Sequence, residues 1–226
     1  MTAEGSLSER LAAVKAGVAD AASRAGRDPR AITTVVVTKF HPVALIRELY
    51  GLGVRNFGES RHQEAQAKAA ELGDLDLDWH FIGQLQSKKA RQVRNYARVI
   101  HSLDRSSVVN ALASDTLTVD CFVQLNLTDD PARGGVADPG LEELVERVLV
   151  TPGLNLLGVM AVAPVGEEPR SAFARLRAAS ERIQRIAPGA RSISAGMSGD
   201  YRAAILEGAT HLRIGSAITG IRPVAG

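Results

Sequence analysis

Short apolar runs alternate with amphipathic stretches along most of the chain. The segment from Leu7 to Ala25 carries apolar side chains at helical spacing and predicts an opening amphipathic helix. Runs rich in β-branched and aromatic residues then predict eight strands, at Thr33–Thr38, Val54–Phe57, Asp78–Ile82, Arg98–His101, Val119–Leu125, Leu154–Met160, Arg191–Ser194 and His211–Ile214. Helical patterns lie between them, and several strands lack polar alternation, which is typical of a parallel sheet covered on both faces.

Eight strands with helices between them in 226 residues predict an α/β fold. We expect a single (β/α)8 barrel of the TIM type with an extra N-terminal helix. A doubly wound open sheet is the alternative, and the number of strands separates the two. No Pro/Gly-rich linker divides the chain, so residues 1–226 are expected to form one domain, with 1–30 as the N-terminal helix and lead-in.

Composition and charge narrow the class of protein. The net charge of +2 gives no basis for binding nucleic acid, and no apolar stretch approaches the roughly 20 residues of a membrane span. The single cysteine, Cys121, lies in an apolar run and is expected to be a small buried residue, which suits a reducing, cytoplasmic compartment. The five histidines lack metal-ligand spacing, so no metal site is expected. His80 is expected to be hydrogen-bonded inside the barrel, with a ligand contact as the alternative.

The loops after the seventh and eighth strands carry the clearest chemical signal. In barrels of this type the active site lies at the carboxyl ends of the strands, and these two loops often bind phosphate. Small residues there let backbone N–H groups approach an anion, and hydroxyls add donors. The candidate contacts are Ser194, Gly196, Ser198, Gly215 and Ser216. Each loop alone could be an ordinary turn, but the two together favour a phosphate site.

Lys39 ends the first β-branched run, where a turn residue would be usual. A partly desolvated lysine at a strand end can lose its proton and attack an aldehyde. Together with the phosphate loops, this amine predicts a phosphorylated aldehyde, for which pyridoxal 5′-phosphate is the candidate cofactor. The alternatives are a lysine that ends the strand in solvent or pairs with Glu59.

Arg213, on the eighth strand, is the third element of the predicted site. Its guanidinium could face the pyridine nitrogen of the cofactor and, because arginine stays protonated, would keep that nitrogen unprotonated. The ring would then be a weaker electron sink than with an aspartate partner. A surface salt bridge is the alternative for Arg213.

Several sequence blocks in a fixed order carry a family resemblance. They are Val37-Thr38-Lys39, Asn56-Phe57-Gly58-Glu59, Trp79-His80-Phe81-Ile82-Gly83, Ser194-Ala195-Gly196-Met197-Ser198 and Arg213-Ile214-Gly215-Ser216. With them the chain resembles the pyridoxal phosphate homeostasis proteins, single-domain relatives of the alanine racemase barrel, from roughly Val35 to Arg222. The loops after strands 2, 3 and 5 depart from the usual family pattern.

The resemblance implies a role for each predicted site residue. Lys39 would be the Schiff-base lysine and Arg213 the partner of the pyridine nitrogen. Phosphate contacts would come from Ser194, Ser198, Gly215 and Ser216. Asn56 and Met160 match positions that line the cofactor in such proteins.

Two function classes follow, a carrier and an enzyme. The first is a protein that stores, buffers or delivers pyridoxal phosphate inside the cell, with no catalytic residues, as a monomer that transiently meets apo forms of enzymes that use the cofactor. The second is an amino-acid racemase, which needs an acid/base on each face of the cofactor. Full-length alanine racemases supply the second face from a separate β-domain, which we do not expect here. Tyr201, near the phosphate loop, is the one candidate substitute. We expect the carrier.

Overall fold

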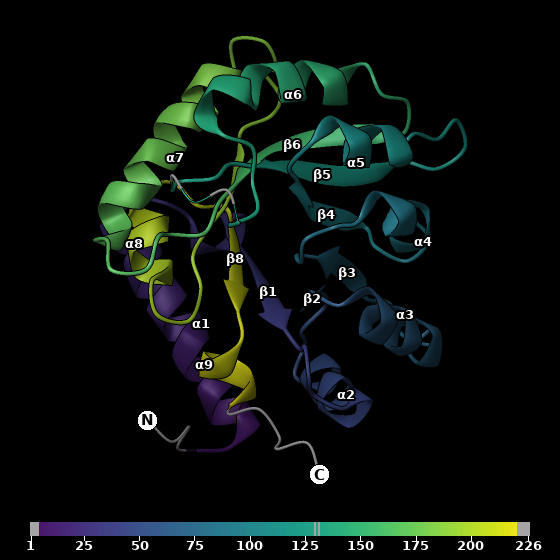
Figure 1. The fold of residues 1–226 in the computed structure, drawn as a ribbon. Helices are drawn as coiled ribbons and strands as arrows, with labels where there is room; N and C mark the ends of the chain where they lie inside the picture. The colour runs from purple at the N-terminus through teal and green to yellow at the C-terminus, as the bar shows by residue number, and fades with distance from the viewer. Residues whose placement is uncertain (1–4, 129, 131, 221–226) are drawn as a thin grey trace.

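The computed structural model describes residues 5–128, 130 and 132–220 and shows a closed barrel surrounded by helices (Figure 1). Its eight strands follow one another in chain order, each parallel to the next, and the last pairs with the first. The predicted (β/α)8 barrel is therefore confirmed, and the open-sheet alternative is wrong. Asp129 and Pro131, in the loop after the fifth strand, lie outside the described residues.

The strands are β1 Thr33–Val37, β2 Asn56–Glu59, β3 Asp78–Phe81, β4 Val99–Leu103, β5 Val119–Gln124, β6 Leu154–Met160, β7 Ser192–Ser194 and β8 His211–Ile214. The α-helices are α1 Leu7–Arg24, α2 Val43–Gly51, α3 His62–Glu71, α4 Ala90–Arg94, α5 Ser106–Ala111, α6 Leu141–Leu149, α7 Pro169–Ile183, α8 Tyr201–Leu206 and α9 Ser216–Thr219. Three short 3-10 turns complete the order, at Pro29–Ala31, Ser87–Lys89 and Asp138–Gly140.

Two strand boundaries differ from the sequence prediction in a way that matters for the site. β2 begins at Asn56, two residues later than expected, because a turn through Gly53 at φ +87° leaves 54–55 outside the strand. Asn56 therefore starts its strand instead of ending it. β4 continues to Leu103, so His101 lies within its strand.

The N-terminal helix closes the outer layer of the fold. Ser6 and Glu9 form a capping box at the start of α1, and the helix packs on α8 and α9 (Figure 1). Gly17 is required at this contact, because a Cβ there would lie 2.2 Å from the Tyr201 hydroxyl. No helix in the described part of the chain is long and apolar enough to cross a membrane.

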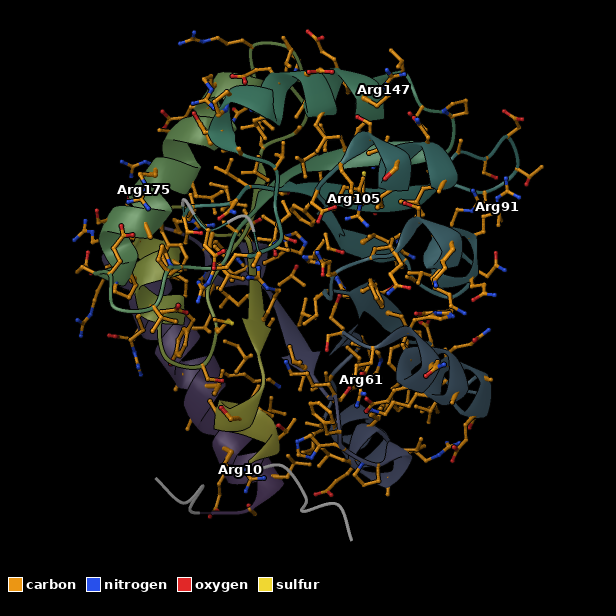
Figure 2. All side chains as sticks on the ribbon, in the orientation of Figure 1. Arg10, Arg61, Arg91, Arg105, Arg147 and Arg175 are labelled. Carbon is orange, nitrogen blue, oxygen red and sulfur yellow. The ribbon has the colours of Figure 1, made fainter. Side chains whose placement is uncertain are left out.

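The main apolar core lies between the outer face of the strands and the helices. Cys121, expected to be a small buried residue, is fully buried there, and burial raises the pKa of its thiol. Many charged side chains lie on the outer surface of the helices, although Glu59, Lys68 and Arg213 are buried. The labelled Arg91, Arg147 and Arg175, for example, lie on the outer helices α4, α6 and α7 (Figure 2).

The interior of the barrel is smaller and partly polar. Phe122 packs there with Val99 and Met160, and it stacks on His101 with ring centroids 4.7 Å apart. His80 bonds His101 across 2.9 Å, which confirms its expected interior hydrogen bond. Burial lowers the pKa of His80 to about 3 and that of His211 to about 4, and it lowers the pKa of His101. The three imidazoles are therefore neutral at physiological pH.

A buried ion cluster joins the end of β1 to β2 and α3. The Lys68 ammonium donates to Glu59 at 2.7 Å, to Glu64 at 2.7 Å and to the Thr38 carbonyl at 2.8 Å. The Thr38 hydroxyl also donates to Glu59, at 2.8 Å. Burial raises the pKa of Glu59, while the bonds from Lys68 and Thr38 oppose that rise. The cluster fixes the chain just before and after Lys39, because Glu64 also accepts from the Phe40 N–H.

Replacing Lys68 by methionine should reduce the free energy of unfolding by about 3–5 kcal/mol, because it leaves two carboxylates facing each other without their cation. Arg47→Met is the matched control, since the Arg47–Asp74 pair is exposed and should be worth about 0–1 kcal/mol. Urea unfolding of both variants measures the difference. Equal losses in the two variants would contradict a structural role for the cluster.

The free energy of unfolding should begin to fall below about pH 6.5, above the range in which carboxylates titrate. Below about pH 6.5 the unfolded chain protonates histidines that the fold keeps neutral. The unfolded state then binds more protons than the folded state, so the free energy of unfolding falls as the pH decreases. Three such groups give a slope of about 4 kcal/mol per pH unit. Urea unfolding between about pH 7 and about pH 5 measures the slope, which His211→Gln should reduce by about one third. A pH-independent free energy of unfolding over that range would contradict neutral histidines.

Candidate functional site

A cavity of about 420 Å³ opens at the carboxyl ends of the strands. This volume lies in the range of small-molecule sites. Loops after β1, β2, β3, β6, β7 and β8 build its wall. The lining residues are Val37, Lys39, His41, Ser60, Ile82, Val162, Met197, Ser198, Gly199, Arg213, Gly215, Ser216, Thr219 and Gly220. This lining has two cationic side chains and no carboxylate.

Lys39 lies at the wall of the cavity, half-buried, two residues beyond the end of β1. Among the described residues, none accepts a hydrogen bond from its ammonium group or pairs with it. Glu59, the alternative partner considered from the sequence, bonds Lys68 and Thr38 instead. The backbone after Lys39 turns sharply, because Phe40 has φ +68°, a left-handed conformation that is unfavourable for an aromatic residue. Glu64 supports this turn through the 2.6 Å bond from the Phe40 N–H.

The rim beside this turn carries an arginine. The Arg61 guanidinium lies 5.3 Å from the centre of the Phe40 ring. Figure 2 shows Arg61 between α2 and α3, on the side of the barrel where β2 ends. Its contact with Phe40 is a second support for the backbone that presents Lys39.

Arg213 lies on β8 and is only 4% exposed, so the alternative of a surface salt bridge is wrong. One terminal nitrogen donates to the Ser194 hydroxyl at 2.6 Å and the other to the Ala161 carbonyl at 2.8 Å. Both acceptors are neutral, and no carboxylate bonds the guanidinium in the described part of the chain. Burial lowers the Arg213 pKa to about 10, so the group still carries its charge at neutral pH.

The loops after β7 and β8 face the cavity together. The Ala217 N–H donates to the Ser198 hydroxyl at 3.2 Å, which ties one loop to the other. The backbone N–H groups of Ser198, Gly199 and Ser216 have no acceptor within the described ranges. Amides that line a cavity without protein acceptors are the donors an anion can use. The arrangement is thus a cradle for an anionic group beside Lys39.

The cavity brings together five of the nine predicted site residues, Lys39, Ser198, Arg213, Gly215 and Ser216. The other four are not among its lining residues. Asn56 bonds His80 at the amino end of β2, and Met160 packs inside the barrel beside Phe122. The Ser194 hydroxyl lies between His101 and Arg213. Gly196, at φ +92°, packs on α8, where a Cβ would lie 2.8 Å from that of Ala204.

Sequence reasoning missed Val162 and Met197 in the wall, where their apolar side chains are partly exposed. Both residues follow the carboxyl end of a strand, β6 or β7, and that position could have predicted that they line the cavity. Tyr201, the candidate second acid/base, does not line the cavity, because its hydroxyl lies against Gly17 of α1. No cluster of three metal-ligating side chains occurs in the residues the structure describes.

Comparison with known proteins agrees with this fold. The family model for the alanine racemase N-terminal domain matches residues 10–223. The chain is 40% identical over 223 residues to a pyridoxal phosphate homeostasis protein of Pseudomonas aeruginosa, which covers 96% of each chain. A protein of that name from Corynebacterium glutamicum is 40% identical over 88% of this chain and 94% of its own.

Solved structures give the same relationship. PipY of Synechococcus elongatus, solved with pyridoxal phosphate bound, superposes with a TM-score of 0.83 at 34% identity, over 95% of this chain and all of that one. Alanine racemase of Corynebacterium glutamicum shares the fold with a TM-score of 0.71 at 16% identity. The chain therefore belongs to the alanine racemase N-terminal domain family and, within it, to the pyridoxal phosphate homeostasis proteins.

Proposed function

We propose that this protein binds pyridoxal 5′-phosphate in the cavity at the carboxyl ends of the strands and holds it covalently through Lys39. It would buffer or deliver this cofactor in the cell without strong catalysis. The observation that carries the proposal is the Lys39 amine, which has no partner among the described residues and lies in a cavity that Arg213 also lines. The same cavity contains backbone N–H groups that donate to no protein acceptor in the described residues. Pyridoxal phosphate bound to the relative PipY supports the choice of ligand.

The residues present fit this cofactor. A phosphate needs several donors, and the loops after β7 and β8 supply acceptor-free amides in a lining that contains no carboxylate. The Asp200 carboxylate of the β7 loop accepts from the Met197 N–H and does not line the cavity. Bound pyridoxal phosphate supplies an aldehyde, which condenses with a primary amine to form a C=N bond and release water. Lys39 is the amine in the cavity lining, since Lys68 is fixed in its buried cluster.

Each wall residue then has a task. Lys39 forms the covalent link, and the amides and hydroxyls around Ser198, Gly215 and Ser216 hold the phosphate. Arg213 would direct N–H groups toward the pyridine nitrogen. Because a guanidinium only donates, that nitrogen would remain unprotonated, and the ring would withdraw electrons weakly. This electrostatic arrangement favours holding the cofactor over stabilising a carbanion.

The four predicted residues outside the lining take supporting roles in this proposal. Ser194 holds Arg213, Gly196 lets the β7 loop pack on α8, and Asn56 and Met160 contact other side chains of the barrel interior. We further propose that the protein acts in the cytoplasm as a monomer and transfers the cofactor to apo enzymes in transient contacts. An amino-acid racemase is not favoured, because Tyr201, which the sequence offered as a second acid/base, faces α1.

Lys39→Ala should abolish the covalent adduct while leaving the fold intact. The wild-type protein, incubated with pyridoxal phosphate and reduced with borohydride, should carry the cofactor on the peptide containing Lys39. Mass spectrometry of the digest identifies the modified residue. Lys88→Ala is the control, because its side chain lies outside the cavity lining and should not affect labelling. Labelling that persists in Lys39→Ala would contradict the assignment.

The loaded wild-type protein should not interconvert alanine enantiomers faster than free pyridoxal phosphate at the same concentration. The reason is that Tyr201, the candidate second acid/base, does not line the cavity, and Arg213 would weaken the electron sink. Chiral chromatography after incubation with L-alanine measures the rate. D-alanine formation well above the free-cofactor background, and lost in Lys39→Ala, would favour the racemase instead.

A further inference from the structure

Four hydrogen bonds in series run from Arg213 into the barrel interior. Arg213 contacts Ser194 at 2.6 Å, Ser194 contacts His101 at 2.8 Å, and His101 contacts His80 at 2.9 Å. His80 then contacts the side-chain oxygen of Asn56 at 2.9 Å. The four bonds join side chains from β8, β7, β4, β3 and β2. Ser194 and His101 are fully buried, and His80 is 2% exposed.

Donor and acceptor chemistry decides which atom donates in each of these hydrogen bonds. A guanidinium only donates, so the Ser194 oxygen accepts from Arg213. The Ser194 hydrogen must then go to Nδ1 of His101, the other atom its oxygen contacts. His101 is neutral, so its proton is on Nε2 and points to Nδ1 of His80. The neutral His80 therefore carries its proton on Nε2, directed at the Asn56 oxygen.

Every hydrogen along the chain has one acceptor, and reversing any link would leave a buried group unsatisfied. If His101 carried its proton on Nδ1, the Ser194 oxygen would accept it as well as the Arg213 N–H, and the Ser194 hydrogen would have no acceptor. A buried donor without an acceptor is unfavourable, because it has lost its bonds to water and gained none in the protein. The series of hydrogen bonds therefore has one direction. At its Arg213 end, the Ser194 oxygen is held in place as an acceptor for the guanidinium.

We propose that Ser194, His101, His80 and Asn56 are positioning residues for Arg213. The chain fixes the plane of the guanidinium at one terminal nitrogen, while the Ala161 carbonyl fixes the other. Arg213 then lines the cavity in one orientation, and no carboxylate in the described part of the chain bonds its guanidinium. The inference deepens the function proposed above and rests on it, because the pyridine nitrogen is the group at which Arg213 is aimed.

Histidine tautomers in the cofactor-free protein give the first test. Two-dimensional 15N NMR of the imidazole rings should show His80 and His101 neutral, both with the proton on Nε2. Ser194→Ala should release His101 from this constraint and populate its second tautomer. A proton on Nδ1 of either ring in the wild-type protein would overturn the chain, whatever the cofactor result.

Cofactor affinity gives the second test. Ser194→Ala should weaken pyridoxal phosphate binding about 10-fold or more and change the visible absorption of the bound cofactor, while Lys39 is still labelled after reduction. Ser194→Thr, which keeps the hydroxyl, should restore the wild-type spectrum and tautomers. Equilibrium dialysis and absorbance spectra provide these readouts.

Ser102→Ala is the matched control. Ser102 is as buried as Ser194 and neighbours His101 on β4, but its hydroxyl has no partner in the described part of the chain. Its removal should leave affinity and spectrum unchanged. Equal affinities for Ser194→Ala and Ser102→Ala would overturn the positioning role alone. A wild-type protein that does not bind pyridoxal phosphate at all would overturn both this role and the proposed function.

Discussion

Closure of the barrel between its first and last strands is the interaction on which the site depends. β1 pairs in register with β8, from Thr33 opposite His211 to Val36 opposite Ile214. Lys39 leaves β1 beside Gly215 and Ser216, which leave β8. In an open sheet these strands would be opposite edges, and the amine would lie far from the anion cradle. Parallel pairing all round also sends every strand's carboxyl end to one mouth.

The cavity at the carboxyl ends of the strands is lined by cationic side chains and by no carboxylate. Lys39 and Arg213 line the cavity, whereas the buried carboxylate of Glu59 lies outside the lining and pairs with its own cation, Lys68. An acid inside the cavity would pair with the Lys39 amine and hold its proton. Lys68 therefore has two effects, since it pairs with Glu59 and anchors the Thr38 carbonyl beside Lys39.

The barrel interior holds the buried charge of Arg213 without bonding it to a carboxylate. A buried guanidinium normally pairs with a carboxylate, but Arg213 bonds a hydroxyl and a carbonyl. Its charge therefore remains available to the cavity. His101 and His80, the neutral histidines behind Ser194, supply acceptors without adding charge of either sign, and His101 also stacks on Phe122. A site of this kind holds an electron-poor ring without activating it strongly, as suits a carrier.

The sequence by itself determined the alternation of strands and helices, the closed barrel, and the residues that leave β1, β7 and β8. Hydrophobic periodicity and the position of a residue at a strand end are local properties, so Lys39, Ser198 and Ser216 could be placed in the mouth. Only the tertiary structure decided which way residues within strands point. Both faces of a parallel barrel strand are buried, so its pattern does not distinguish interior from exterior.

Met160 and Ser194 show the consequence, because each lies within a strand and points inward instead of into the mouth. A register shift between Cys121 and Phe122 where β5 meets β6 changes which side chains meet, and no sequence pattern marked it. The partners of Asn56, His80 and Lys68 come from different strands and helices. Hydrogen bonds between such segments depend on register and strand tilt, which form only when the barrel closes.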